Sequence, residues 1–564
     1  MTTTLTNARM GGHLLVDQLR LHGVEQVFCV PGESYLAVLD GLYDSDIDVT
    51  VCRQEGGAAM MAEAYGKLQG KPGICMVTRG PGVANAMAGI HIAQQDSTPL
   101  IVFVGQVARE MQDREAFQEL DYKAVFGSQT KWTCEIQQVD RIPELIARAF
   151  HVASSGRPGP VVISLPEDML CEYSQAKDAR PYTITDTAAS VEQVQSLHER
   201  VLAAKQPIAI LGGTRWTSDA VAQFESYAAA MSLPVCAQFR RQTLFSNNHA
   251  CYVGDLGLGA NPDLLAYIRS SDLVILLGGR GSEVPSQSYT LFDIPHGAQE
   301  LVHVHPDVHE LNKVYQANLA IHASPSAFIA ALAPLASGFS RPSSESLKAL
   351  RSSYQQWNQP ASIRTPGALQ MGPIMDYLRK ELPDDAILCN GAGNYASWLH
   401  RFYNFRRFGT QLAPTSGSMG YGVPAAVSAK RQYPDRTVIA LAGDGCFLMH
   451  GQEFATAVQY GLNIVVIVID NQMYGTIRMH QERDYPARPS ATMLKNPDFA
   501  AYAQAFGGHG ERVDTTEQFA PAFERAMKSG KPAIIHCLLD PQAITPTLSL
   551  DAIRDQALKQ NNSH

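Results

Sequence analysis

The chain reads GDGCFLMHGQEFATAVQYGLNIVVIVIDN from Gly443 to Asn471. Apolar runs at 437–442, just before this stretch, and at 463–469, near its end, are typical of buried parallel strands. Residues 452–460, between them, have helical character. The stretch therefore predicts a strand–loop–helix–strand unit of an open α/β sheet.

Two polar side chains follow the two predicted strands. Asn471 comes 27 positions after Asp444, and both are expected at the carboxyl ends of neighbouring strands, where open α/β sheets bind ligands. A carboxylate and an amide oxygen are hard ligands suited to Mg²⁺ that also binds phosphate oxygens and water. Gly443 and Gly445 would let backbone amides approach an anion. A Gly-Asp-Gly alone is usually an ordinary turn, so the spacing to Asn471 carries this interpretation.

Length and composition limit the class of protein. A chain of 564 residues predicts about three domains of ~150–200 residues. A net charge of −9 argues against nucleic-acid binding, which needs a basic surface. There is no apolar run of about 18 residues, so no membrane span is expected. The polar N-terminal segment and ten cysteines without a Cys-x-x-Cys pair predict a cytoplasmic protein with reduced thiols.

Alternating strand and helix patterns predict three successive doubly wound parallel-sheet domains, at residues 1–172, 188–336 and 364–546. A polar tail, 547–564, is at most helical and could be a mobile lid. The expected strands are 26–30, 48–52, 73–78, 100–104 and 159–164 in the first domain; 207–211, 234–237, 273–277 and 301–305 in the second; and 386–389, 411–413, 437–442, 463–469 and 533–538 in the third.

The spacing of Asp444 and Asn471 resembles the signature of the thiamine diphosphate (ThDP) enzymes, a Gly-Asp-Gly followed about one βα unit later by Asn. That family more often has Asn-Asn where this chain has Asp470-Asn471. The resemblance spans nearly the whole chain. It implies an N-terminal domain that binds the pyrimidine ring, a middle domain, and a C-terminal domain that binds the diphosphate.

The resemblance implies that Asp444, Asn471 and the backbone carbonyl of Met473 hold Mg²⁺ against the diphosphate. Met419 would be the apolar wedge that bends the cofactor, and the Gly417 carbonyl would accept a hydrogen bond from its 4′-amino group. Other residues implied to contact the cofactor in this domain are Gly393, Asn394, Tyr395, Gly443, Gly445, Cys446, Tyr474 and Gly475.

Glu55 follows the predicted strand 48–52 and precedes a helix rich in small residues. An acidic residue there could simply complement the helix dipole. The segment from Arg53 to Lys67, however, resembles the family segment whose glutamate hydrogen-bonds the aminopyrimidine ring. A carboxyl group in an apolar setting can exchange a proton near neutral pH, which this role requires. The resemblance also implies a pyrimidine pocket that includes Pro31, Thr78, Gly82 and Asn85.

Ala116-Phe117-Gln118-Glu119 resembles the acetolactate (acetohydroxyacid) synthases, in which the Phe and Gln approach the acceptor pocket, so Gln118 is a catalytic candidate. Branched-chain synthases carry Trp nine residues after the metal-binding Asn, and this chain has His480. That departure argues against a branched-chain biosynthetic role. His480 could relay protons near neutral pH or could lie at the rim of the site.

The middle domain lacks the Arg-Phe-Asp-Asp-Arg run of the flavin-binding synthases, because Gly281-Ser282-Glu283 follows Arg280. This departure makes a bound FAD doubtful, and no ADP or acyl-CoA site is evident in its place.

The leading hypothesis is a ThDP- and Mg²⁺-dependent, acetolactate synthase-like enzyme that decarboxylates a 2-oxo acid and then performs carboligation or protonation. A second is a ThDP-dependent lyase or acyl transferase acting on a 2-hydroxyacyl-CoA, a diketone or a sulfonate. A third is a non-catalytic ThDP-binding regulatory protein, against which the presence of Glu55 counts. In the family, the residues equivalent to Glu55 and Asp444 of one site come from different subunits. A homodimer is therefore the expected minimum, and a homotetramer is expected by the same resemblance.

Overall fold

The computed structural model describes residues 8–561. They contain three six-stranded parallel sheets, which confirms the predicted fold class. The chain forms two compact units: one reaches to Thr185 and adds Val427–Gln432, and the other holds Asp186–Ala426 and the chain from Tyr433 onward. The first unit contains one large sheet and the second contains two.

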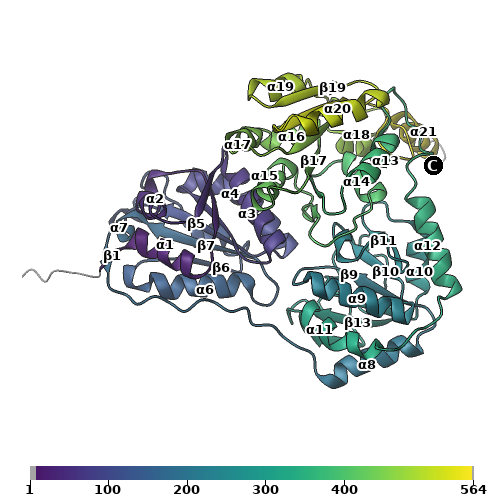
Figure 1. Ribbon diagram of the computed structural model, residues 1–564, viewed down its shortest axis with the longest axis horizontal. Helices are drawn as coiled ribbons and strands as arrows, with labels where there is room; N and C mark the ends of the chain where they lie inside the picture. Colours follow the sequence, from purple (N-terminus) through teal and green to yellow (C-terminus); the bar gives the residue numbers. More distant parts are fainter. Residues whose placement is uncertain (1–7, 562–564) are drawn as a thin grey trace, which may run out of the picture. The chain divides into compact units, whose positions relative to one another are not determined.

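The first sheet has the strand order β3-β2-β4-β5-β7-β6. Helices α1 (Gly11–Leu21) and α6 (Ile142–Ser154) pack together against one face, and α3 (Glu55–Gln69) and α4 (Gly80–Asp96) pack together on the other (Figure 1). The small side chains of α3 are buried all around the helix, as expected for a helix enclosed in a core. The strands of this first sheet are β2 (Gln26–Cys29), β3 (Asp48–Val51), β4 (Gly73–Val77), β5 (Leu100–Gln106), β6 (Trp132–Glu135) and β7 (Pro160–Pro166).

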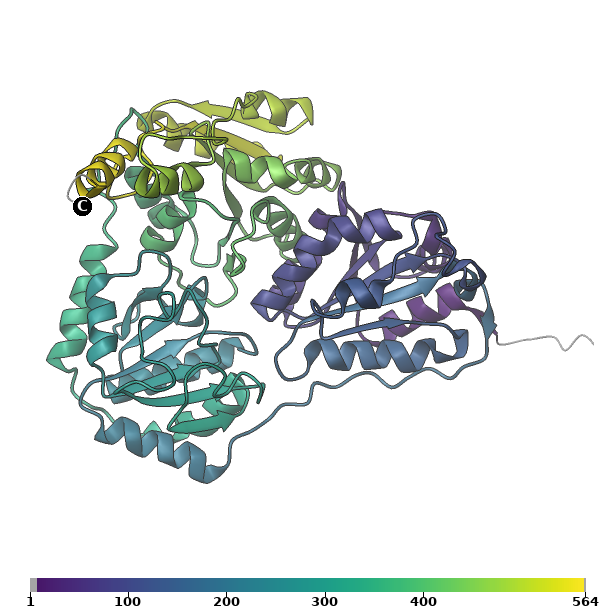
Figure 2. The same cartoon turned by 180° about the vertical axis from the view of Figure 1, so that it is seen from behind.

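The middle sheet has the order β11-β10-β9-β12-β13-β14. In this doubly wound order the strands are added outward from β9 in one direction and then from β12 in the other, and the switch point between these two parallel strands is the usual position of a dinucleotide crevice. Helices α10 (Pro262–Ser270) and α12 (Glu345–Trp357) run side by side in both views (Figures 1 and 2). The strands are β9 (Pro207–Leu211), β10 (Val235–Gln238), β11 (Tyr252–Leu256), β12 (Leu273–Leu277), β13 (Glu300–His305) and β14 (Leu319–His322).

The third sheet has the order β16-β15-β17-β18-β20-β19. Gly443, the last residue of β17, is in register with Ile469 on β18, so Asp444 and Asn471 follow neighbouring strand ends as predicted. The predicted helix at 452–460 is α17 (Glu453–Gln459), and an unpredicted helix, α16 (Asp444–His450), precedes it. The strands are β15 (Ile387–Asn390), β16 (Gln411–Leu412), β17 (Val438–Gly443), β18 (Val465–Asp470), β19 (His509–Val513) and β20 (Ala533–Leu538).

The predicted tail is largely the helix α21 (Leu550–Asn561), which packs against α18 (Gly475–Asp484). Leu550 and Ile553 are buried with Ile544, and Met479 of α18 packs against them. Movement of this helix as a lid stays a prediction. Between residues 8 and 561, no helix is both long enough and apolar enough to span a membrane.

Candidate functional site

A cavity of about 260 Å³ opens at the carboxyl edge of the third sheet. Its walls include the loops that follow β15, β17 and β18, which are neighbours in the sheet. His480 lies further along α18 and is not part of the lining. The other residues predicted for this domain all line the cavity: Gly393, Asn394, Tyr395, Gly417, Met419, Gly443, Asp444, Gly445, Cys446, Asn471, Met473, Tyr474 and Gly475.

Three helices begin at this cavity. Helix α14 (Tyr395–Phe402) begins at Tyr395, α16 at Asp444 and α18 at Gly475, and all three residues line the wall. The first amides of a helix have no partner within the helix, and the helix dipole makes that end positive. The cavity is therefore suited to an anion.

The lining of the cavity holds a single charged side chain. Asp444 is the one carboxylate, and no Lys or Arg lines the cavity. Within residues 8–561, no cluster of three or more His, Cys, Asp or Glu side chains could hold a metal ion unaided. A cation here would thus need the Asn471 amide oxygen, the Met473 carbonyl and oxygens of a bound anion. This oxygen set fits Mg²⁺ held against a diphosphate.

Glycines shape the cavity by leaving room for aromatic rings. A Cβ at Gly445 would lie 2.6 Å from Cε1 of Tyr474, and one at Gly443 would lie 2.9 Å from Cδ1 of Tyr395. Gly417 has φ +69°, and nothing lies within 4 Å of the position its Cβ would take. Larger residues at 443 and 445 would displace the rings, and one at 417 would strain the backbone.

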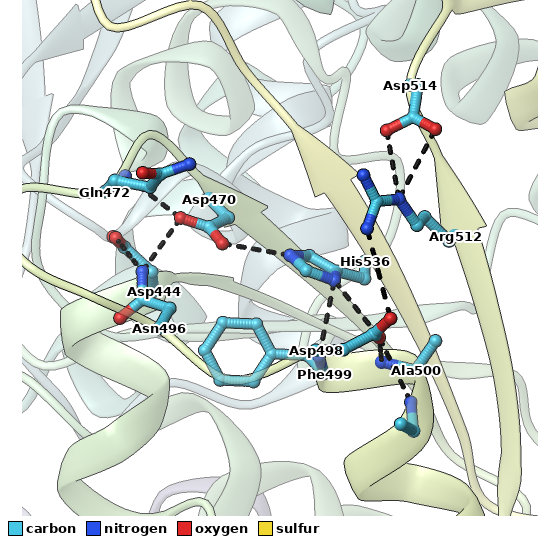
Figure 3. Close-up of polar contacts among 11 residues, drawn as sticks. Asp444, Asp470, Gln472, Asn496, Asp498, Phe499, Ala500, Arg512, Asp514 and His536 are labelled. Carbon is cyan, nitrogen blue, oxygen red and sulfur yellow. Dashed lines mark hydrogen bonds and ion pairs between the residues drawn. The ribbon is translucent and has the colours of Figure 1, made fainter.

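The Asp444 carboxylate belongs to a hydrogen-bond network (Figure 3). The Asn496 amide nitrogen donates to Oδ2 of Asp444 at 2.7 Å and to Oδ1 of Asp470 at 2.8 Å. Oδ2 of Asp470 lies 2.9 Å from Nε2 of His536, whose Nδ1 accepts from the backbone N–H of Phe499 at 3.3 Å. This assigns the Nε2 proton to the contact with Asp470. Asn496, Asp470 and His536 thereby orient the predicted metal ligand, as supporting residues commonly do.

The environments of the two carboxylates move their pKa values in opposite directions. Burial raises the pKa of Asp444 to about 6, partly offset by the hydrogen bond from Asn496. Burial also acts to raise the pKa of Asp470, but hydrogen bonds from His536, Asn496 and the Gln472 backbone outweigh it and lower that pKa. Asp470 therefore loses its proton at a lower pH than Asp444.

Asn394 connects the loop after β15 to two other walls. Its side-chain nitrogen donates to the Ile544 carbonyl at 3.2 Å, and its oxygen accepts from the Thr476 hydroxyl at 2.9 Å. Thr476, Ile544 and Trp398 also line the cavity, although the sequence analysis did not select them. They carry no distinctive spacing and become recognisable only when the loops are brought together.

The first unit gathers its own predicted residues at the carboxyl ends of the neighbouring strands β3, β2 and β4. Pro31, Glu55 and Thr78 follow β2, β3 and β4, respectively. Oε2 of Glu55 accepts a hydrogen bond from the Asn85 side chain at 3.0 Å. A Cβ at Gly82 would lie 3.5 Å from Oε1 of Glu55 and 2.8 Å from Cγ2 of Thr78. Asn85 and Gly82 thus lie beside the half-buried Glu55 carboxylate, Thr78 packs against Gly82, and Pro31 lies at the same sheet edge.

The remaining catalytic candidates have less definite surroundings. Gln118 adopts φ +64°, and its carbonyl accepts from the Gly80 backbone at 3.0 Å. This contact holds the Gln118 backbone beside the start of α4. Nδ1 of His480 is buried and has no hydrogen-bond partner within the described chain. Both the relay and the rim interpretations of His480 therefore stay open.

The crevice of the middle sheet is filled by a side chain. Oε1 of Gln238 lies 2.0 Å from the position that a Cβ would take at Gly212, after β9, and 2.3 Å from that at Gly279, after β12. Its amide nitrogen donates to the Arg280 carbonyl at 2.8 Å. Gln238 thus bridges the two loops beside the switch point of the middle sheet, the usual position of a dinucleotide in doubly wound sheets.

Comparison with known proteins agrees with the division into three sheets. The family models of the thiamine pyrophosphate (ThDP) enzymes match as an N-terminal TPP binding domain at residues 9–125, a central domain at 194–332 and a C-terminal TPP binding domain at 391–537. The chain is 30% identical to the acetolactate synthase isozyme 2 large subunit of Escherichia coli, covering 94% of this chain and 95% of that protein.

Two further relatives have similar coverage. The acetolactate synthase large subunit of Corynebacterium glutamicum is 30% identical, over 94% of this chain and 87% of its own length. The acetolactate synthase of Mycobacterium leprae is 29% identical, over 97% of this chain and 90% of its own length. The similarity therefore extends through all three domains.

Proposed function

Because the chain belongs to the acetolactate synthase-like thiamine pyrophosphate enzymes, we propose that it uses ThDP and Mg²⁺ to decarboxylate a 2-oxo acid. The acyl fragment that remains after loss of CO₂ would then be added to a carbonyl acceptor or be protonated. The observation that carries this proposal is the cavity lined by Asp444, Asn471 and three helix N-termini. When bound, ThDP supplies the electron sink that decarboxylation needs, and the protein supplies position and electrostatics.

The lack of basic side chains in the cavity wall supports the proposed metal site. A diphosphate in a cavity without Lys or Arg needs another source of positive charge. Mg²⁺ on Asp444, Asn471 and the Met473 carbonyl supplies it, and the helix N-termini add to it. The contacts from Asn496 hold Asp444 in place for that role. Met419 lines the same cavity and acts as the apolar wedge under the bent cofactor.

Glu55 acts at the other end of the cofactor. Its Oε2 is engaged by Asn85, which fixes the orientation of the carboxyl group beside Gly82 and Thr78. In this orientation Glu55 would exchange a proton with the aminopyrimidine ring when ThDP is bound, and Pro31 would line the same pocket. Gln118 and His480 act on the substrate side, where His480 relays a proton or forms the rim.

Each active site takes residues from two chains. Glu55 belongs to one compact unit and Asp444 to the other, and the family resemblance assigns the equivalents of these residues to different subunits. The assembly is thus a homodimer at least, and a homotetramer follows if dimers pair.

A lyase or acyl transferase acting on a 2-hydroxyacyl-CoA, a diketone or a sulfonate is the second candidate. This candidate would use the same ThDP-binding residues as the first candidate, and only the substrate distinguishes the two. A purely regulatory ThDP-binding role is disfavoured by Glu55, because binding alone does not need an acid at the ring.

Substrate class is tested by measuring CO₂ release from a panel of 2-oxo acids, with and without aldehyde and ketone acceptors. We expect ThDP- and Mg²⁺-dependent release from at least one small 2-oxo acid such as pyruvate. Glu55→Ala enzyme serves as the background control. Cleavage of an acyl-CoA, diketone or sulfonate substrate, with no release from any 2-oxo acid, would favour the second candidate.

Glu55→Ala should retain ThDP binding but slow exchange of the thiazolium C2 proton by about 10²–10⁴-fold, because the ring loses its acid partner. NMR of the bound cofactor measures that exchange. Glu110→Ala, which changes an exposed acid of the same unit, is the matched control and should exchange at the wild-type rate. Wild-type exchange in Glu55→Ala would contradict the role of this residue.

Asp444→Ala should abolish Mg²⁺-dependent ThDP binding in calorimetry, because the one carboxylate of the cavity is lost. Asn496→Ala keeps that carboxylate but removes its hydrogen-bond donor, so we expect binding about 10–100-fold weaker. Asp435→Ala changes an exposed residue just before the start of β17, at the end of the strand away from Asp444. This control variant should bind ThDP normally. Undiminished affinity in Asp444→Ala would remove the metal assignment.

The enzyme should work without flavin, because Gln238 occupies the crevice of the middle sheet. Protein purified from a flavin-supplemented host should lack flavin absorbance. Titration of the wild type with FAD, ADP or coenzyme A should release no binding heat. Stoichiometric flavin in active protein would show that Gln238 moves aside, and this proposal would then fail.

A further inference from the structure

Tyr395 and Cys446 lie together in the wall of the cavity, although they come from different loops. Tyr395 begins α14 and Cys446 lies in the first turn of α16. Oη of Tyr395 is 3.2 Å from Sγ of Cys446, and the two residues are only 7% and 3% exposed. Burial raises the pKa of Tyr395 well above its ordinary value, so the phenol stays protonated.

Two backbone amides complete the contacts of this Tyr395–Cys446 pair. The N–H of Gly391 donates to Oη of Tyr395 at 3.1 Å, and the N–H of Gly420 donates to Sγ of Cys446 at 3.2 Å. Gly391 follows β15, whereas Gly420 precedes α15 (Gly422–Gln432). The pair therefore connects three separate loops of the cavity wall.

Close packing fixes the pair from several sides. A Cβ at Gly391 would lie 2.5 Å from Sγ of Cys446, and one at Gly393 would lie 2.8 Å from Cε1 of Tyr395. The Tyr395 ring also packs on Gly443. Because the side chains fill the space between these loops, a shift of one loop would be transmitted to the others.

We propose that Tyr395 and Cys446 are positioning residues that set the Met419 loop against the Asp444 loop before ThDP binds. Gly420 directly follows Met419, and Cys446 lies two residues after Asp444. The sulfur thus connects the loop under the bend of the cofactor to the loop that holds its metal. A preformed spacing lowers the cost of ordering these loops on binding. This inference rests on the proposed function.

Calorimetry of ThDP binding at saturating Mg²⁺ tests the pair. Tyr395→Phe and Cys446→Ala should each raise the dissociation constant about 10-fold, within the range found when residues supporting a site are removed. The double variant should bind little worse than either single variant, because both remove the same connection. Cys446→Ser keeps a hydrogen-bond acceptor and should restore most of the affinity.

Cys251→Ala is the matched control, since Cys251 is also 3% exposed but lies in the middle domain. It should lower the melting temperature of the cofactor-free protein, as Cys446→Ala should, but without changing ThDP affinity. Wild-type affinity in both Tyr395→Phe and Cys446→Ala would overturn the positioning role. If those two variants bind normally while Asp444→Ala abolishes ThDP binding, only the positioning role fails and the proposed function stands. If Asp444→Ala also binds ThDP normally, the proposed function itself fails.

Discussion

The site depends on how the third sheet accommodates an anion without a basic side chain. Parallel strands bring their carboxyl ends to one edge, and the loops after β15, β17 and β18 meet there. No Lys or Arg lines the resulting cavity, so a bound anion would be stabilised by helix N-termini and, in our proposal, by a cation on Asp444. The glycines, the Asn496 contacts and the Tyr395–Cys446 pair all maintain the geometry that this requires.

Glu55 and Asp444, to which we assign complementary roles, lie in separate compact units. The acid that would activate the cofactor ring and the metal ligand that would hold its diphosphate can thus be supplied by different copies of the chain. Catalysis would then require assembly, and a single folded chain would bind the cofactor through only one half-site. In the middle domain, Gln238 lies across the crevice between the loops after β9 and β12, and our proposal places no second cofactor there.

Much of this architecture could be predicted because central parallel strands are continuous apolar runs: 273–277 and 533–538 match β12 and β20 in full. Among the strands that were not predicted, β6, β11, β14 and β19 lie at the edges of the large sheets. β6, β14 and β19 carry partly exposed residues, which weaken the apolar pattern. The strand ends also located Asp444 and Asn471, whereas the other cavity residues, such as Met419 and Asn394, were expected only from the family resemblance. Asn496 and Gln238 could not be found, because their roles arise from contacts between loops distant in sequence.

The central claim is that Glu55 and Asp444 serve one cofactor from two chains. Its most direct test is to mix inactive Glu55→Ala and Asp444→Ala chains, reassemble them and measure turnover. Random pairing into symmetric dimers would leave about one quarter of the sites intact, so activity should return to about that fraction of wild type. Mixed dimers that form but remain as inactive as the two parent variants would contradict the account.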